Sequence, residues 1–127
     1  MGEQIQVIVI DDDPMVRTAV RMIMATAPDI EVVGDAGEGR AGLDLVRAHR
    51  PDVVLCDIRM PHMDGLAILA ELQATGDTTP VIMLTTFNTD DYVVRAFQLG
   101  AKGFLLKDAD PRDMVQAVRD VRAGRPA

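Results

Sequence analysis

The chain has 127 residues, of which 48% are hydrophobic, and it carries a formal net charge of −7. That length suits one domain, and the apolar content is sufficient for a packed core, which argues against intrinsic disorder. No apolar run approaches the roughly 20 residues that span a bilayer, and the first residues lack the pattern of a signal peptide, so we expect a cytoplasmic protein that does not enter the membrane. Because the sequence has no basic stripe, we do not expect this chain itself to bind nucleic acid.

Five short apolar runs bounded by turn residues predict strands, at residues 6–10, 31–34, 53–56, 81–84 and 103–106. Their continuous hydrophobicity is typical of parallel strands that are covered on both faces. Cys56, the only cysteine, lies at the end of the third run. A single cysteine excludes a disulfide framework and a thiolate metal cluster within this sequence, and its apolar neighbours predict a buried strand residue rather than a catalytic thiol.

Between the strands, apolar residues recur at intervals of three and four, which is typical of amphipathic helices. The predicted apolar faces are Val16, Ala19, Val20, Ile23 and Met24; Ala41, Leu45 and Ala48; Leu66, Leu69, Ala70 and Leu72; Val93, Ala96 and Phe97; and Met114, Val115, Val118 and Val121. Asp13 and Asp110 are each followed by proline, which predicts a capped helix start at both places. Gly100 and Gly124 are predicted to follow helix ends.

Five strand–helix units in succession predict an α/β fold, a doubly wound five-stranded parallel sheet with helices on both faces. The periodicity does not reveal the order of the strands in the sheet. We expect residues 1–123 to form one domain and residues 124–127 to begin a linker.

Polar residues follow four of the five predicted strands. After the first strand come Asp11 and Asp12, after the third Asp57, after the fourth Thr85, and after the fifth Lys107. In an open α/β sheet, ligands bind beyond the carboxyl ends of the strands, so we expect these side chains to share one site. The second strand is expected to contribute nothing to it, and the third acid of the first loop is interpreted as the helix cap described above.

The chemistry of this set follows from its charges. Three neighbouring carboxylates raise one another's pKa unless a cation compensates them, and oxygen ligands with room for water suit Mg²⁺, or Mn²⁺. Lys107 and the Thr85 hydroxyl are placed to hold the oxygens of an incoming phosphoryl group. Phosphoryl transfer depends mainly on positioning and charge neutralisation, and the predicted site provides both.

Four segments carry a resemblance to the receiver domains of two-component response regulators: VIVIDDD, VVLCDIRMPHMDG, VIMLTT and GFLLK. The block after Asp57 is the most specific of them. The resemblance covers essentially the whole chain and implies the flavodoxin-like receiver fold, with strand order 2-1-3-4-5.

The resemblance also implies the roles of individual acids. Asp57 resembles the phosphoacceptor, which takes a phosphoryl group from a phosphohistidine of a sensor histidine kinase. Asp12 and Asp57 resemble direct metal ligands, together with the backbone carbonyl of Arg59. Asp11 resembles the acid that reaches the metal through water.

A second group of residues resembles the phosphoryl-binding and switch positions of the family: Thr85, Thr86, Lys107 and Phe104. Activation in this scheme is a population shift biased by the phosphoryl group. Arg59 and Phe87 lie two positions after Asp57 and Thr85, and we hypothesise that their side chains restrict the attacking water and so tune the lifetime of the phosphoryl group. The alternative is that both side chains point into solvent.

The segments LTTF and LLKDA resemble the NarL/FixJ subfamily, in which a LuxR-type helix-turn-helix domain follows the receiver. No such domain lies within this sequence, so any contact with DNA is expected from a C-terminal output domain, and a homodimer linked to phosphorylation is a further expectation. Asp108 stands after Lys107 where many receivers have a cis-proline, and we expect a trans bond there because a cis bond before a non-proline residue costs about 3 kcal/mol.

Two alternatives remain at this point. A haloacid-dehalogenase-type phosphatase also places acids after its first strand, but that interpretation leaves Asp57 and the block after it unexplained. A non-phosphorylated receiver-like interaction module usually lacks one of the acids or the lysine, and all of them are present here.

Overall fold

Five strands form one parallel sheet in the order β2-β1-β3-β4-β5, which confirms the predicted α/β fold and strand order. The computed structural model describes residues 4–86 and 90–125. The strands are β1 (Ile5–Ile10), β2 (Ile30–Ala36), β3 (Val53–Asp57), β4 (Val81–Thr85) and β5 (Gly103–Leu106). Strand β2 extends beyond both ends of the predicted run because its pairing with β1 includes Ile30 at one end and Asp35 and Ala36 at the other.

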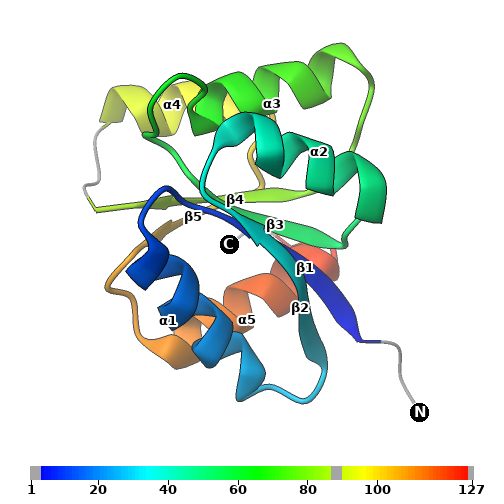
Figure 1. The fold of residues 1–127 in the computed structure, drawn as a ribbon, viewed down its shortest axis with the longest axis vertical. Coiled ribbons are helices and arrows are strands. Elements are labelled where there is room, and N and C mark those ends of the chain that lie inside the picture. The colour runs from blue at the N-terminus through cyan, green and yellow to red at the C-terminus, as the bar shows by residue number, and fades with distance from the viewer. Residues whose placement is uncertain (1–3, 87–89, 126–127) are drawn as a thin grey trace.

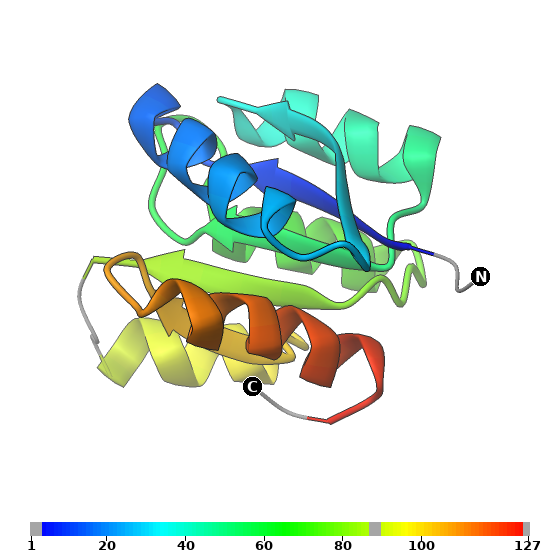
Figure 2. The ribbon, with the colours of Figure 1, turned by 90° about the horizontal axis from the view of Figure 1, so that it is seen from below.

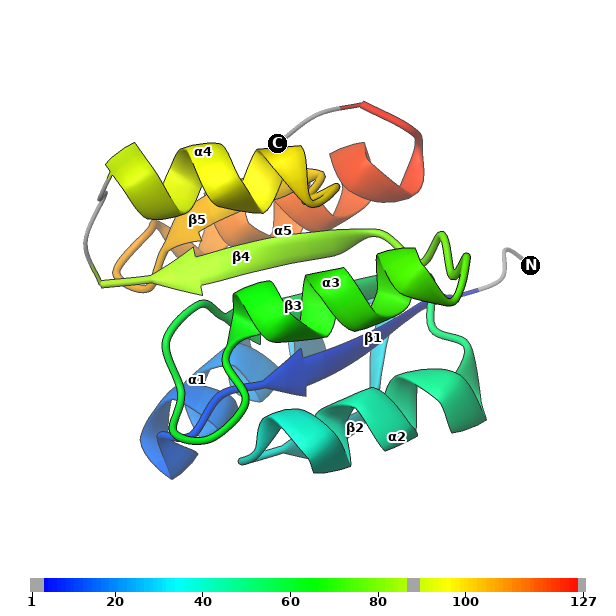
Figure 3. The ribbon, with the colours of Figure 1, turned by 90° about the horizontal axis from the view of Figure 1, so that it is seen from above.

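The helices cover both faces of the sheet. They are α1 (Pro14–Ala25), α2 (Gly39–His49), α3 (Gly65–Ala74), α4 (Asp90–Gln98) and α5 (Pro111–Arg122). Helices α1 and α5 lie on one face, and α2, α3 and α4 lie on the other (Figure 1). The first pair is seen in front of the sheet in Figure 2, and the other three are seen in front of it in Figure 3. None of the described helices is long and apolar enough to cross a bilayer.

The core consists of two clusters, one on each side of the sheet, because side chains alternate along each strand. In β1, Val7 and Val9 pack with α1 and α5, whereas Ile8 and Ile10 pack with α2, α3 and α4. Cys56 is fully buried in the second cluster, as predicted. Its burial, and then the nearby charge of Asp57, raise the pKa of the thiol, so the thiol stays protonated and plays a packing role.

The predicted faces of some helices require correction. In α2, the predicted Ala41 and Ala48 are exposed, and Leu43 and Val46 are buried instead. The larger side chains gain more from burial than alanine does, and they determine which face of the helix meets the sheet. Phe97 of α4 is also 46% exposed, although its spacing placed it on the apolar face.

The predicted helix ends are confirmed. Asp13 accepts a hydrogen bond from the Met15 amide at 2.9 Å, and Asp110 accepts one from the Arg112 amide at 2.8 Å. Gly100 (φ 99°) has the left-handed conformation that favours glycine after a helix. The described residues contain no cis peptide bond, in agreement with the trans bond expected after Lys107.

Candidate functional site

The carboxyl ends of four strands meet at one edge of the sheet. Asp11 directly follows β1, Asp57 and Thr85 are the last residues of β3 and β4, and Lys107 directly follows β5. Figure 3 shows the arrowheads of β1 and β4 pointing to this common edge. Asp11, Asp57 and Thr85 are the buried polar residues of the described chain, with exposed fractions of 0%, 4% and 6%. The sheet therefore brings the predicted acids, hydroxyl and ammonium together in a region that largely excludes water.

Lys107 joins the two buried acids. Its Nζ lies 2.9 Å from Asp11 Oδ2 and 3.1 Å from Asp57 Oδ2. Burial by itself lowers the pKa of Lys107, but its interactions with the carboxylates of Asp11 and Asp57 outweigh burial and raise the pKa above its ordinary value. Lys107 is therefore held as a cation between two acids, and the Lys107 amide, which donates to Thr85 O at 2.8 Å, fixes the strand ends that carry it.

The charge of Asp57 is only partly compensated by its surroundings. Its burial, and then the charge of Asp11, raise the pKa of Asp57 to about 6 even though Lys107 lowers it. The Arg59 amide donates only a long hydrogen bond, 3.3 Å, to Asp57 Oδ1. One lysine therefore does not neutralise the site, and a further cation would favour the ionised form of Asp57.

The donor set fits a hard divalent cation. Asp11, Asp12 and Asp57 each offer a carboxylate oxygen within 4.8 Å of the others, and Asp12 is exposed at the mouth of the site. Asp11 Oδ1 accepts from the Asp13 amide at 2.9 Å. Within residues 4–86 and 90–125, no donor reaches the buried Asp11 Oδ2 at hydrogen-bonding geometry, and Lys107 meets it as an ion-pair partner. Oxygen ligands with unused capacity are what Mg²⁺ prefers.

The loop that follows Asp57 returns closely to the strand it left. The Gly65 amide, at the start of α3, donates to Ile58 O at 3.1 Å. A Cβ atom at Gly65 would lie 2.5 Å from Asp57 O, so any side chain there would displace the phosphoacceptor candidate or the helix. Asp64 caps α3 by accepting from the Ala67 amide at 2.9 Å. The Asp-Gly pair in the sequence block thus has a structural explanation: Asp64 caps the helix, and Gly65 leaves room for Asp57 O.

The predicted switch residues occupy neighbouring positions on the last two strands. Thr85 is buried at the end of β4, and Thr86 directly after it is exposed. Phe104 of β5 is half-buried against the α2, α3 and α4 side of the core, with its ring centroid 6.4 Å from that of Phe97 in α4. The Phe104 ring of β5 therefore lies next to α4. A pathway that connects the site with that helix needs such a contact.

The two candidates for tuning the phosphoryl lifetime differ in what the structure describes. Phe87 lies outside the described residues. Arg59 is exposed, and its guanidinium carbon lies 5.4 Å from the ring centroid of Tyr92 in α4, a distance suitable for a cation–π interaction. Tyr92 was not anticipated from the sequence, because contacts between a loop and a helix 33 positions away leave no periodic signal.

A second group was also missed: α1 and the end of β2 support the first acidic loop. Arg17 of α1 donates from Nη1 to Asp11 O at 2.8 Å and pairs through Nε with Asp35 Oδ1 at 3.3 Å. Arg21, one turn later, pairs with Asp35 Oδ2 at 2.7 Å. The signal was present as two arginines four residues apart beside the apolar face of α1. The expectation that the second strand adds nothing holds for direct contacts with the site but overlooks this support.

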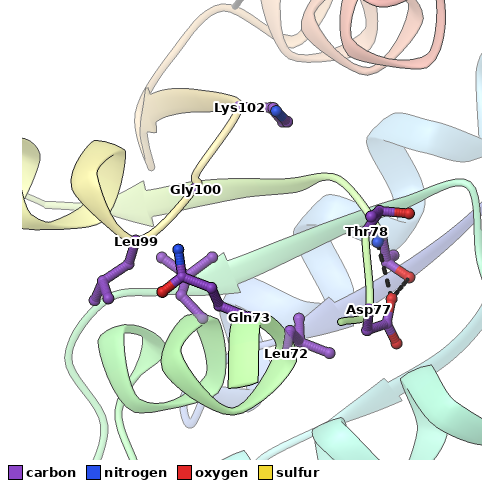
Figure 4. Close-up of a pocket in the computed structure, with 9 residues that line it drawn as sticks. Leu72, Gln73, Asp77, Thr78, Leu99, Gly100 and Lys102 are labelled. Carbon is purple, nitrogen blue, oxygen red and sulfur yellow. Dashed lines mark hydrogen bonds between the residues drawn. The ribbon is translucent and has the colours of Figure 1, made fainter. Parts of the chain in front are cut away.

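A separate pocket lies at the opposite edge of the sheet, near the amino ends of β4 and β5 (Figure 4). Its volume is about 170 Å³, and it is lined by apolar Leu69, Leu72 and Leu99 together with polar side chains that include Gln73 and Asp77. Asp77 already accepts hydrogen bonds from the amide and hydroxyl of its neighbour two residues on. This pocket shares no residue with the acidic site.

Comparison with known proteins identifies the family. The profile of the response regulator receiver domain matches residues 7–119. The chain is 38% identical over 122 residues to the nitrate/nitrite response regulator protein NarL of Escherichia coli K12, covering 96% of this chain and 56% of that protein. It is 40% identical over 123 residues to the probable transcriptional regulatory protein NarL of Mycobacterium tuberculosis, covering 97% and 57%. The chain therefore spans little more than half the length of these curated relatives.

Solved structures agree in fold. The signal receiver domain of NarL from Mycobacterium tuberculosis superimposes with a TM-score of 0.94 at 40% identity, covering 98% of this chain and 100% of that one. The response regulator ChrA of a heme-sensing two-component system superimposes with a TM-score of 0.83 at 36% identity, covering 99% of this chain and 60% of that one. The acids, the lysine and the fold described above therefore have one common explanation: this chain belongs to the response regulator receiver domain family and is a phosphoacceptor signalling domain similar to the receivers of NarL-type regulators.

Proposed function

We propose that Asp57 is the phosphoacceptor and takes its phosphoryl group from a phosphohistidine of a sensor histidine kinase. The observation that carries this proposal is the cluster of Asp11, Asp12 and Asp57, in which the ammonium of Lys107 pairs with both Asp11 and Asp57. An oxygen of the Asp57 carboxylate forms a bond to phosphorus as the bond from phosphorus to the imidazole nitrogen breaks, and the acyl phosphate stays on the protein. Lys107 already pairs with Asp57, so its ammonium is placed to bind an oxygen of the incoming phosphoryl group.

The carboxylates of Asp12 and Asp57 and the carbonyl of Arg59 would hold Mg²⁺, or Mn²⁺, directly, and Asp11 would hold it through water. When bound, the ion neutralises the crowded acids and polarises the phosphoryl oxygens. Asp11 remains fixed by its own hydrogen bonds, while Lys107 balances the buried charge. The main task of these residues is positioning, which phosphoryl transfer chiefly needs.

The same residues relay the state of Asp57. The Thr85 hydroxyl and the Thr86 amide contact phosphoryl oxygens, and the movement of Thr85 makes room for Phe104 to change its position. Phe104 packs towards α4 through Phe97, so the change reaches the surface of that helix. The phosphoryl group then acts as a ligand that favours one of two conformations.

Arg59 and Phe87 tune the lifetime of the acyl phosphate by restricting the approach of water. The position of the Arg59 guanidinium over Tyr92 supports an interaction with α4 for Arg59. Replacing Phe87 with serine should accelerate hydrolysis, and an unchanged decay rate in that variant would remove Phe87 from the proposal.

The whole regulator is proposed to be cytoplasmic and to carry a C-terminal LuxR-type helix-turn-helix domain after the receiver of residues 1–123 and the linker that starts at 124–127. The relatives named above are a response regulator and a transcriptional regulatory protein that extend well beyond the matched region, which supports this arrangement. Phosphorylation is proposed to favour a homodimer.

The direct test is labelling with acetyl phosphate and Mg²⁺, read by intact mass and by sedimentation. The wild-type chain should gain one phosphoryl group, and Asp57→Asn should gain none. Omission of Mg²⁺ should reduce labelling strongly because the metal itself is missing, and Asp12→Asn should do so because one carboxylate ligand of the metal is lost.

Asp13→Asn is the matched control. Asp13 is the neighbouring acid, but its carboxylate caps α1, and asparagine caps a helix about as well as aspartate. Labelling should therefore survive this substitution. Full labelling of Asp57→Asn would refute the assignment, and the absence of any labelling in the wild-type chain would favour the non-phosphorylated interaction module.

A further inference from the structure

Arg17 connects three parts of the chain that lie around the first acidic loop. Its Nη1 donates to Asp11 O at 2.8 Å, and its Nε faces Asp35 Oδ1 at 3.3 Å. A Cβ atom at Gly37 would come within 2.8 Å of the same Nη1, so the turn after β2 packs directly on the guanidinium. Two edges of a rigid, planar group are thus engaged at once, which restricts its rotation more than a single contact would.

The carbonyl that Arg17 engages belongs to the peptide unit between Asp11 and Asp12. Asp11 is fully buried, and its amide is bonded on the other side to Ala36 O at 3.0 Å. Because a peptide unit is planar, a hydrogen bond to the Asp11 carbonyl also fixes the orientation of the Asp12 amide and the start of the Asp12 residue. Arg17 therefore bonds to the backbone rather than to the carboxylates of Asp11 and Asp12. By fixing the peptide plane between these two residues, it fixes the orientation of one carboxylate relative to the other.

We propose that Arg17, anchored by Asp35, is a positioning residue that keeps the carboxylates of Asp11 and Asp12 in the geometry needed to bind Mg²⁺. This inference rests on the proposed function, because it assumes that these acids bind the metal. It assigns a role to the end of β2, which supplies no ligand of its own. Whether removal of Arg17 weakens or strengthens Mg²⁺ binding distinguishes a positioning role from a simple effect of its charge.

Charge and positioning predict opposite results when Arg17 is removed. Loss of a nearby positive charge should tighten the binding of a divalent cation, because one repulsive interaction disappears. Loss of a positioning contact should weaken binding, because the Asp11–Asp12 peptide can then reorient. Partners that orient metal ligands typically change metal affinity by about ten-fold or more when they are removed, which exceeds a screened charge effect near the surface.

Arg21 provides a matched control for the test. It carries the same charge on the same helix and pairs with the same Asp35, at 2.7 Å, but the hydrogen bond to the Asp11 carbonyl comes from Arg17 and not from Arg21. The variants Arg17→Met and Arg21→Met therefore remove the same charge and the same kind of ion pair. Only the first removes the hydrogen bond to the peptide between the acids.

The experiment is an NMR titration of the isolated chain with Mg²⁺ alone, followed by amide chemical shifts, for the wild type, Arg17→Met, Arg21→Met and Asp12→Asn. Arg17→Met should raise the apparent Kd for Mg²⁺ by about ten-fold, and Arg21→Met should leave this Kd within about two-fold of the wild-type value. Urea unfolding in EDTA should show similar stability for both methionine variants. Equal or tighter binding by Arg17→Met would overturn the inference.

A variant that keeps Arg17 guards against a folding failure of Arg17→Met. Asp35→Asn leaves both acids and the guanidinium in place but removes the charge that anchors it, and it should weaken Mg²⁺ binding more than Asp13→Asn does, although Asp13→Asn removes the same negative charge from the acidic loop itself. Equal affinities for these two variants would count against the inference. If the wild-type chain shows no saturable binding, the metal site itself is wrong and this inference falls with it; if the wild type binds and Asp12→Asn does not, a failure belongs to the role of Arg17 alone.

Discussion

The two edges of the sheet place carboxylates in opposite situations. At the amino edge, Asp52 accepts from the Gln6 amide at 2.8 Å and pairs with Arg122 at 3.2 Å. Asp29 forms a two-pronged pair with Arg119 at 2.8 and 2.9 Å, and its hydrogen bonds hold the pKa of that carboxyl below its ordinary value. Asp52 and Asp29 each have a cation of their own.

At the carboxyl edge, two buried acids share the ammonium of Lys107, and a third acid lies within reach. The pKa of Asp57 rises to about 6 as a result, chiefly through burial and then through Asp11. The comparison shows that the functional edge is distinguished by incomplete compensation of charge rather than by the presence of acids. A site that is short of one cation suits the divalent metal that we propose for it.

The largest expected effect comes from removing the cation that pairs with both buried acids of the carboxyl edge. Lys107→Met leaves two buried carboxylates without their partner, so the free energy of unfolding in EDTA at neutral pH should fall by about 3 kcal/mol. Labelling by acetyl phosphate should also slow markedly. Urea unfolding and mass spectrometry measure the two effects, and a variant as stable and as quickly labelled as the wild type would contradict this view of Lys107.

The second effect concerns pH. Folded Asp57 binds its proton more tightly than the unfolded chain does, so its contribution to stability is present at low pH and is lost as the pH rises from about 4 through about 6. In EDTA, the free energy of unfolding of the wild type relative to Asp57→Asn should fall by on the order of 2 kcal/mol across this interval. Millimolar Mg²⁺ should reduce the difference, because a bound cation favours the carboxylate.

The measurement is a series of urea titrations of both proteins between pH 4 and pH 7. Using the difference between the two proteins removes the opposite contributions of acids such as Asp29, whose pKa is lowered in the folded state. If the difference in free energy of unfolding between the two proteins stays constant with pH, the folded structure does not raise the pKa of Asp57.

A smaller effect is expected at the amino edge. Asp52→Asn weakens the contact with Arg122 but keeps an acceptor for the Gln6 amide, so stability at neutral pH should fall by about 1 kcal/mol or less. Labelling of Asp57 should be unchanged. A clear loss of labelling in Asp52→Asn would show that the two edges are coupled rather than separate.

The smallest effect is expected for the exposed pair of Asp29 and Arg119. Double-mutant cycles with Asp29→Asn and Arg119→Gln should give a coupling that decreases with added salt, because both groups are accessible to solvent. Urea unfolding at low and high ionic strength provides the measurement. A coupling that is insensitive to salt would indicate that this pair is shielded in solution.

Much of the fold could be predicted because its signals are local. The five apolar runs and the caps at Asp13 and Asp110 were confirmed at or near their predicted positions. The buried face of α2 was wrong because spacing alone does not weigh alanine against larger neighbours such as Leu43. The strand order came from resemblance to a family, since hydrophobic periodicity carries no information about which strands are adjacent.

The sequence by itself determined which residues stand at the strand ends, and a parallel sheet then brings them to one edge whatever the details of packing. Only the tertiary structure decided how their charges are balanced: that Lys107 lies between Asp11 and Asp57, and that Arg17 reaches the Asp11 carbonyl. These contacts depend on side-chain directions and on distances of about 3 Å between segments far apart in the chain. Such distances follow from the packing of helices against the sheet, which no local pattern in the sequence specifies.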